Sequence, residues 1–133
     1  MNKNNLGKKG EEYCVEELEK LGYEIIDKNF HSPYGEIDII AKEAQSLVFI
    51  EVKSRSKSTV DKTLWDITLS KQKKITKTAM FFLVNYNNPE LFSYRFDVII
   101  IKSDTDKNTG EKVFTLNHYK DAFYPPDVGD FFP

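Results

Sequence analysis

Acidic side chains fall inside apolar patterns at two neighbouring places in this sequence. Asp38 lies in the isoleucine-rich segment 35–41, and Glu51 lies in the apolar segment 47–53, two positions before Lys53. On a strand, residues two apart share a face and stand roughly 6.5 Å apart along the chain. If the two segments pair as a hairpin, Asp38 approaches Glu51 and Lys53 on one surface of a sheet.

The alternation of strand side chains also assigns the isoleucines of the first segment. Ile37 and Ile39 are expected on one face of that strand, and Asp38 and Ile40 on the other. A carboxylate among so many isoleucines is costly unless it is paired or bound to a cation. The pattern therefore favours a functional use of Asp38.

A third acid, Glu11, lies in a helical pattern near the start of the chain. It stands three residues before Cys14 and seven before Leu18. At about 100° per residue, Glu11 falls roughly 60° from Cys14, at the edge of the apolar stripe. We expect this carboxylate to point toward the sheet.

The side chains of Asp38, Glu51 and Lys53 suit metal-assisted attack on a phosphodiester bond. Carboxylate oxygens bind Mg²⁺ through one or two direct bonds, which leaves other positions to water and phosphate. Mn²⁺ prefers similar ligands and is a substitute. The metal lowers the pKa of a bound water, and an ammonium can orient that water or stabilise developing charge. A Glu-x-Lys pair in a strand is also typical of a plain cross-strand ion pair, and this interpretation stays open.

The charge of the chain is unevenly distributed. Its net charge of −2 excludes a uniformly basic nucleic-acid coat protein. Residues 52–77 nevertheless hold eight basic and two acidic side chains, a net +6, whereas residues 1–51 hold six basic and eleven acidic ones, a net −5. A basic segment beside an acidic one predicts a phosphate-binding surface next to a metal-binding carboxylate cluster. A solvated loop and helix face is the alternative.

The length of 133 residues suits one domain, which we expect over residues 1–123, with an extended tail at 124–133. Periodicity and turn residues predict a helix, three strands, a helix and two strands. Their expected ranges are 7–21, 23–30, 35–41, 47–53, 70–85, 95–101 and 113–116. This order predicts an α/β fold with a mixed sheet flanked by helices.

The first helix is expected to bury a stripe of Cys14, Leu18 and Leu21 and to end at a left-handed Gly22. The second helix is expected to begin near Ser70, with either Thr68 or Ser70 as its cap. Its inward-facing side chains are expected to be Ile75, Ala79, Phe82 and Tyr86.

The segments around the second helix have their own patterns. Residues 54–68 have no clear period and predict a loop or a short irregular element. The continuous apolar run 98–101 predicts a strand that is buried on both faces.

Several other kinds of protein and site are disfavoured. A single cysteine allows no intramolecular disulfide, and no cluster of cysteine and histidine has zinc-ligand spacing. The apolar run 79–84 is far shorter than a membrane span, and the start of the chain has no apolar signal segment, so we expect a cytoplasmic protein without membrane contact. His31 and His118 stand isolated in the sequence. Arg95 and Asp97 favour a structural ion pair over a substrate contact.

Motifs in order along residues 7–123 carry a resemblance to a known family. They are Gly7-x-x-Gly10-Glu11, Leu21-Gly22-Tyr23, Asn29, Gly35-Glu36-Ile37-Asp38, Phe49-Ile50-Glu51-Val52-Lys53-x-Arg55, Lys71-Gln72, Ala79, Arg95-Phe96-Asp97-Val98 and Asp121-Ala122-Phe123. The sequence resembles the small bacterial YraN-like family, which belongs to the PD-(D/E)xK nuclease superfamily. This family is similar to archaeal Holliday junction resolvases. It departs from the superfamily at the proline, because Ile37 precedes Asp38.

This resemblance implies a restriction-endonuclease-like α/β fold. The site residues that it implies are the metal ligands Asp38 and Glu51, the catalytic lysine Lys53 and the additional acid Glu11. It also places Lys71 and Gln72 at the start of the second helix, where backbone N–H groups suit phosphate contact.

Together, the residues and the resemblance predict a Mg²⁺-dependent endonuclease that acts on DNA rather than RNA, with branched or single-stranded repair and recombination intermediates as substrates. The expected phosphate contacts are Arg55, Lys57, Lys71, Gln72 and Lys74. The alternative is a nucleic-acid-binding or partner-binding module with the same fold and little catalytic activity. A homodimer, which symmetric cleavage of a junction would require, stays open.

Overall fold

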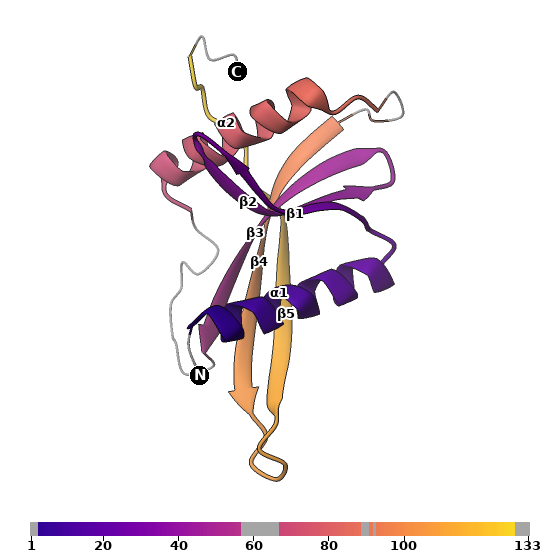
Figure 1. Cartoon of the computed structure of the whole chain (residues 1–133), viewed down its shortest axis with the longest axis vertical. Helices are drawn as coiled ribbons and strands as arrows, with labels where there is room; N and C mark the ends of the chain where they lie inside the picture. The colour runs from indigo at the N-terminus through magenta and orange to yellow at the C-terminus, as the bar shows by residue number, and fades with distance from the viewer. Residues whose placement is uncertain (1–2, 57–66, 89–90, 92, 130–133) are drawn as a thin grey trace.

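The computed structural model describes residues 3–56, 67–88, 91 and 93–129. Its elements follow the expected order of one helix, three strands, one helix and two strands (Figure 1). The helices are α1 (Lys3–Lys20) and α2 (Leu69–Asn85). The strands are β1 (Glu24–Ser32), β2 (Gly35–Glu43), β3 (Ser46–Ser56), β4 (Ser93–Thr105) and β5 (Lys112–Phe123). The predicted α/β fold is confirmed, and residues 124–129 form neither helix nor strand.

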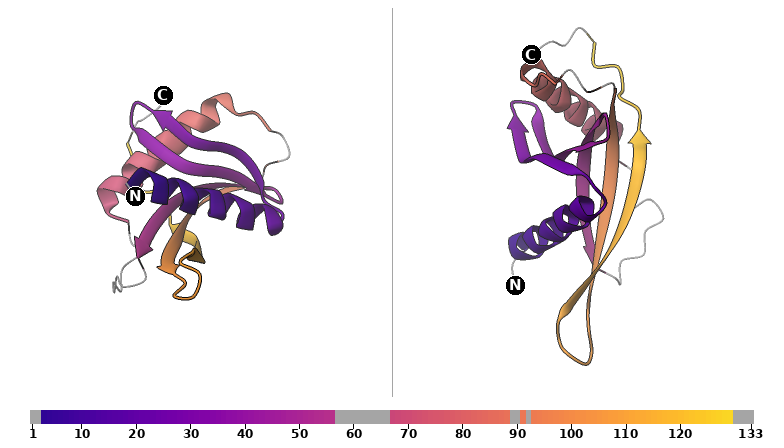
Figure 2. Two further views of the ribbon diagram at one scale, coloured as in Figure 1. Left: turned by 60° about the horizontal axis from the view of Figure 1, so that its bottom comes forward. Right: turned by 90° about the vertical axis from the view of Figure 1, so that its right-hand side faces the viewer.

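The five strands form one mixed sheet in the order β1-β2-β3-β4-β5. Neighbouring strands are antiparallel except for the central pair, in which β3 and β4 run parallel. Parallel strands need a long crossover connection, and α2 lies in the connection between β3 and β4. The β4–β5 hairpin extends past α1 at one end of the sheet (Figures 1 and 2).

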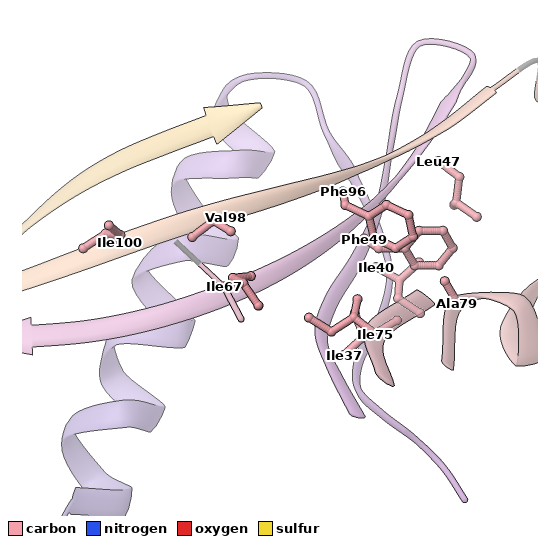
Figure 3. Packing of buried hydrophobic residues seen from close by; sticks show 10 residues of the cluster. All are labelled: Ile37, Ile40, Leu47, Phe49, Ile67, Ile75, Ala79, Phe96, Val98 and Ile100. Carbon is pink, nitrogen blue, oxygen red and sulfur yellow. The ribbon is translucent and has the colours of Figure 1, made fainter. Parts of the chain in front are cut away.

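The middle strands of the sheet, β2, β3 and β4, are buried on both faces because each helix covers one face. Cys14 and Leu18 of α1 pack with Ile39, Val48 and Ile50 on the first face. On the second face, α2 packs against residues from β2, β3 and β4 (Figure 3). The core residues of this second face are Ile37, Ile40, Leu47, Phe49, Ile67, Ile75, Ala79, Phe96, Val98 and Ile100.

The expected double-sided burial of the run 98–101 is confirmed. Val98 and Ile100 belong to the core under α2, whereas Ile99 and Ile101 belong to the core under α1. Such a strand can only be a central one, because an edge strand or a one-sided strand would expose half of these side chains to water.

The end of α1 follows the expected glycine cap but differs in one side chain. Gly22 has φ 93°, and the N–H of Tyr23 donates to the carbonyl of Leu18 at 3.0 Å, which is a Schellman arrangement. Leu21 was predicted to be buried, yet 70% of it is exposed. The prediction was wrong because the helix ends at Lys20, so Leu21 no longer continues the helical stripe.

The start of α2 is capped as one of the two sequence alternatives predicts. Thr68 is the N-cap, and its hydroxyl accepts a hydrogen bond from the N–H of Lys71 at 3.2 Å. Ile75 and Ala79 are buried, and the rings of Phe82 and Tyr86 pack against the same core, so the predicted inward face is confirmed.

Strand β2 leaves the sheet partway along its length. It pairs with β1 from Gly35 to Lys42, but its pairing with β3 extends only from Glu43 to Ile39, opposite Ile50. The first half of β2 therefore travels with β1 as a hairpin that packs on α2. The Oγ atoms of Ser32 and Thr78 lie 2.9 Å apart across that contact.

The predicted alternation in β2 was wrong at Ile37. This side chain lies in the α2 core with Ile40, whereas Ile39 lies in the α1 core. Ile37 lies beyond the last β2–β3 pair, where β2 follows β1 alone, and Asn29, which the register places opposite Asp38, has φ 53°. A residue in the left-handed region rotates the strand and resets which side chains face which core.

The last three strands are longer than predicted. Residues 54–56, expected in a loop, complete β3. Strand β4 extends from Ser93 to Thr105, and β5 extends from Lys112 to Phe123. Across the described ranges, neither helix combines the length and apolarity needed to cross a membrane.

Candidate functional site

Asp38 lies where β2 leaves β3, and its side chain bridges the two strands. The N–H of Val52 lies beyond the last β2–β3 pair and donates to Oδ2 of Asp38 at 2.7 Å. The carboxylate therefore takes a hydrogen bond that a paired strand would have taken with its backbone. The predicted approach of Asp38 to the strand that carries Glu51 is confirmed by this contact.

The environment of Asp38 disfavours a negative charge. Burial raises the pKa of its carboxyl from 3.8 to about 7, with the charge of Glu51 as the second cause and those of Glu11 and Glu36 as smaller ones. The hydrogen bond from Val52 acts in the opposite direction. Carboxylates that repel one another in a partly buried place are a typical setting for a divalent cation.

Glu51 is held by the start of α2. Its Oε1 lies 2.9 Å from Nζ of Lys71, and only 11% of the Glu51 side chain is exposed, compared with 53% for Lys71. The hydrogen bond with Glu51 raises the pKa of Lys71, with further contributions from the charges of Glu51, Asp38 and Glu36. The ammonium of Lys71, a predicted phosphate contact, therefore contacts Glu51, which together with Asp38 forms what we call the acidic site.

Glu11 borders the site from α1. Its Oε1 accepts a hydrogen bond from Nδ2 of Asn29 at 2.9 Å. Burial raises the pKa of Glu11 above its ordinary value, and the hydrogen bond from Asn29 opposes that shift. Glu11 is half-buried, as its place at the edge of the helical stripe predicted, and its charge acts on Asp38.

Lys53 follows Glu51 on the same face of β3. Both side chains alternate with Val52, which packs in the α1 core, so they point toward the α2 side of the sheet. In the parallel register, Glu51 stands opposite Val98 and Lys53 opposite Ile100. Lys53 is half-buried.

The other predicted phosphate contacts have different settings. Nη1 of Arg55 donates to the carbonyl of Ser54 at 2.9 Å, and Nε2 of Gln72 donates to the carbonyl of Ile67 at 2.8 Å. The Gln72 amide therefore secures the first turn of α2. Lys74 is exposed on α2, beside the glycine that ends the β1–β2 turn. Lys57 lies outside the described residues.

The acidic side chains of the site offer few ligands for the predicted magnesium ion. Within residues 3–56, 67–88, 91 and 93–129, no three acidic, histidine or cysteine side chains lie close enough to share one ion. Asp38 and Glu51 nevertheless provide two carboxylates, and Mg²⁺ in proteins is commonly held by one or two carboxylates together with water and phosphate oxygens. The residues present therefore fit Mg²⁺ with a largely aqueous shell, rather than an all-protein cage.

A second polar cluster, which sequence analysis only half found, surrounds Asp97. Nε of Arg95 lies 3.0 Å from Oδ1 of Asp97, which confirms the predicted structural ion pair. His118, which looked isolated in the sequence, has its Nε2 2.7 Å from Oδ2 of Asp97, and the N–H of Asp121 donates to Oδ1 at 3.0 Å. Burial alone would raise the pKa of Asp97, but the hydrogen bonds from His118 and Arg95 hold it below its ordinary value.

This Asp97 cluster ties together β4, β5 and the end of β2. Nη2 of Arg95 donates to Glu43 at 2.9 Å and to the hydroxyl of Tyr23 at 3.0 Å. The Asp97 side chain has no exposed area, and each of its oxygens has a partner. The Asp97 cluster therefore stabilises the fold.

The thiol of Cys14 also has a structural role. Burial raises the pKa of Cys14 to about 12 and keeps the thiol neutral.

Comparisons with known proteins agree with the extent of the resemblance. A family model described as uncharacterised protein family UPF0102 matches residues 10–101. A UPF0102 protein of Caldicellulosiruptor saccharolyticus is 41% identical over 123 residues, which cover 92% of this chain and all of that protein. A UPF0102 protein of Chlorobium limicola is 40% identical over 120 residues, which cover 90% of this chain and 92% of that protein.

Proposed function

Because the chain belongs to the uncharacterised protein family UPF0102, whose description assigns no activity, we propose from the site itself that it is a metal-dependent endonuclease. The observation that carries this proposal is that Asp38 and Glu51 follow the last β2–β3 pair, where the charge of Glu51 acts on the half-buried Asp38 carboxyl. Two carboxylates in a half-buried place need compensating positive charge, and the Lys71 ammonium pairs with Glu51 alone, so a divalent cation would offset the charge of Asp38 as well. The likeness to PD-(D/E)xK nucleases supports the same interpretation.

The roles of the chain's own residues follow from their positions. Asp38 and Glu51 would hold Mg²⁺, with Mn²⁺ as a substitute, and Glu11 would add negative charge at the edge of the site. The bound metal would supply a water of lowered pKa and offset the charge that develops on the phosphate. The ammonium of Lys53, on the same face as Glu51, would orient the attacking water or stabilise that charge.

Lys71 has a position suited to a second task. Its ammonium rests on Glu51 at 2.9 Å, at the start of a helix whose N–H groups favour anions. When Glu51 holds a cation, Lys71 is released to contact a substrate phosphate. Exposed Lys74 and half-buried Arg55 would extend this basic surface, which suits the phosphate backbone of the DNA substrate that we propose.

The proposal is tested by a cleavage assay with labelled single-stranded, duplex and four-way-junction DNA. The wild type is expected to cut at least one of these substrates in Mg²⁺ or Mn²⁺ and none in EDTA. Glu51→Gln is expected to reduce the rate by about 10²-fold or more, in line with the loss of a metal ligand. Glu16→Gln, an exposed acid on the outer side of α1, is the matched control and should cut at the wild-type rate.

One observation favours a second candidate function. The Lys71–Glu51 ion pair partly neutralises the site without any metal, as a binding module with little catalytic activity would require. Such a module would bind DNA equally well in EDTA and in Mg²⁺, with a strong dependence on salt, and would not cut any of the three substrates. That outcome would replace the nuclease proposal.

A further inference from the structure

A hollow lies beside Glu11, between α1 and β1. Its volume is about 410 Å³, within the range of small-ligand sites, and neither Asp38 nor Glu51 lines it. The described residues that line this α1–β1 hollow are Gly7, Lys8, Glu11, Glu12, Val15, Lys28 and Asn29. Glu11 and Asn29, which are hydrogen-bonded to each other, form the boundary between the hollow and the acidic site.

The two glycines of α1 differ in what surrounds them. A Cβ on Gly10 would lie 3.3 Å from Oγ of Ser54 and 3.5 Å from Ile101, so Gly10 allows α1 to approach the sheet. A Cβ on Gly7 would meet nothing within 4 Å. Glycine inside a helix is destabilising relative to alanine. Among the side chains that the structure describes, no packing contact accounts for Gly7, and what its missing side chain leaves is room in the wall of the hollow.

The lining of the hollow combines apolar and charged groups. Val15 is half-buried and packs against the α1 core, so it provides an apolar surface. Lys8 and Lys28 are exposed, one from each of the two elements that border the hollow, and the acids Glu11 and Glu12 also line it from α1. A nucleotide has the same combination of properties, because its sugar and base are partly apolar while its phosphate is anionic.

We propose that the α1–β1 hollow binds the nucleotide next to the cleaved bond of a nucleic-acid strand, with the phosphate of that nucleotide between Lys8 and Lys28. This inference rests on the proposed nuclease function and adds to it a place for the flanking nucleotide. The room left by Gly7 admits the sugar or base. The strand then passes from the hollow over Glu11 to the acidic site.

The test is DNA binding in EDTA, which needs no cleavage. The affinity for a short labelled single-stranded oligonucleotide is measured by fluorescence anisotropy for the wild type, Gly7→Ala, Gly7→Leu and Lys28→Gln. Lys20→Gln is the matched control, since this exposed lysine lies at the far end of α1. Thermal melting of each variant reports on folding, and Gly7→Leu is expected to melt no lower than the wild type, because leucine favours the helix more than glycine does.

Filling the hollow should weaken binding according to size. We expect a roughly tenfold loss of affinity for Gly7→Leu, equivalent to about 1.4 kcal/mol. A loss of about twofold to threefold is expected for Gly7→Ala and for Lys28→Gln, and less than that for Lys20→Gln. Free thymidine 5′-monophosphate should compete with the oligonucleotide on the wild type and not on Gly7→Leu. If Gly7→Leu melts below the wild type, Gly7→Ala, Lys28→Gln and the competition decide the question.

The result distinguishes this inference from the nuclease proposal. If all hollow variants bind DNA as the wild type does, while the wild type cleaves DNA in Mg²⁺, the hollow is not a nucleotide site and the nuclease proposal stands. If the hollow variants bind weakly and the wild type does not cleave, the hollow is a nucleotide site on a binding module. If the wild type neither binds nor cleaves DNA, both are wrong.

Discussion

The charge at Asp38 makes the metal-free protein less stable than it could be, and Asp38→Asn tests this. Asparagine keeps an oxygen that can accept the hydrogen bond from Val52 N–H, now 2.7 Å from the carboxylate, but it removes the charge. Burial and the neighbouring Glu51 raise the pKa of Asp38 from 3.8 to about 7. We therefore expect the substitution to stabilise the fold at neutral and basic pH.

The magnitude follows from the displacement of this pKa. A shift of the pKa by one unit corresponds to about 1.36 kcal/mol. The rise of the Asp38 pKa from 3.8 to about 7 therefore limits its effect on the unfolding free energy to roughly 4 kcal/mol. The side chain is partly exposed, and solvent screening reduces this to about 2 kcal/mol.

Proton linkage gives the direction in which the unfolding free energy changes with pH. Between the ordinary pKa and about 7, the folded state binds more protons than the unfolded state does. Through Asp38, the wild type should therefore lose about 2 kcal/mol of unfolding free energy as the pH rises through this window. Asp38→Asn should lack this decline.

The assay is urea-induced unfolding in EDTA at several pH values across this range. Glu16→Gln removes one exposed carboxylate from the outer side of α1 and controls for the change in net charge. The reasoning is refuted if Asp38→Asn is no more stable than the wild type above pH 7, or if the two proteins have parallel pH profiles.

Three other substitutions test neighbouring parts of the structure. Asp97→Ala removes the buried partner of both Arg95 Nε and His118, although Arg95 keeps Glu43. It should lower the unfolding free energy in urea by about 3 kcal/mol, and a loss under about 1 kcal/mol would contradict a structural role. Since the pKa of Asp97 is lowered in the folded state, the stability that it confers should decline as the pH falls. Gly10→Leu should lower the stability by about 1–3 kcal/mol because α1 is forced away from β3, and an unchanged melting temperature would contradict this close approach. Lys71→Ala frees Glu51, so the affinity for Mg²⁺ measured by calorimetry should be unchanged or higher. The same substitution should reduce the slope of log affinity for DNA against log salt concentration by about one unit, and an unchanged slope would exclude a phosphate contact.

Local patterns predicted most of the fold because they report on burial of single elements. The left-handed Gly22, the Thr68 cap and the burial of Val98 to Ile101 follow directly from residue type and spacing. The predictions of buried side chains were wrong where a helix ends or a strand changes its pairing, because the regular spacing of inward-facing residues stops there. Leu21 lies past the end of its helix, and Ile37 lies where β2 has left β3 and pairs only with β1, in which Asn29 has a positive φ.

The site was predictable to the extent that it lies within one hairpin. Asp38 and Glu51 come together because two adjacent strands pair, and this pairing can be inferred from the sequence. The contact between Glu51 and Lys71 depends instead on how the crossover helix returns over the sheet, and no local pattern encodes that distance.

The Asp97 cluster was hidden for a similar reason. His118 reaches Asp97 from β5, in a strand pair whose register shifts between Phe96 and Val98. Asn29 belonged to a recognised motif, but only its contact with Glu11 and its backbone angle indicate what it does. Contacts of this kind, between residues far apart in the chain, could be identified only from the structure.

The central claim is that Asp38 and Glu51 form a divalent-cation site, and its most direct test needs no knowledge of the substrate. Mn²⁺ is titrated into metal-free protein by calorimetry at a pH above 7, with the wild type, Asp38→Asn, Glu51→Gln and the Glu16→Gln control. The account predicts saturable binding by the wild type and the control, and its loss in both site variants. Binding that survives in Asp38→Asn and Glu51→Gln, or a wild type that binds no Mn²⁺, would contradict it.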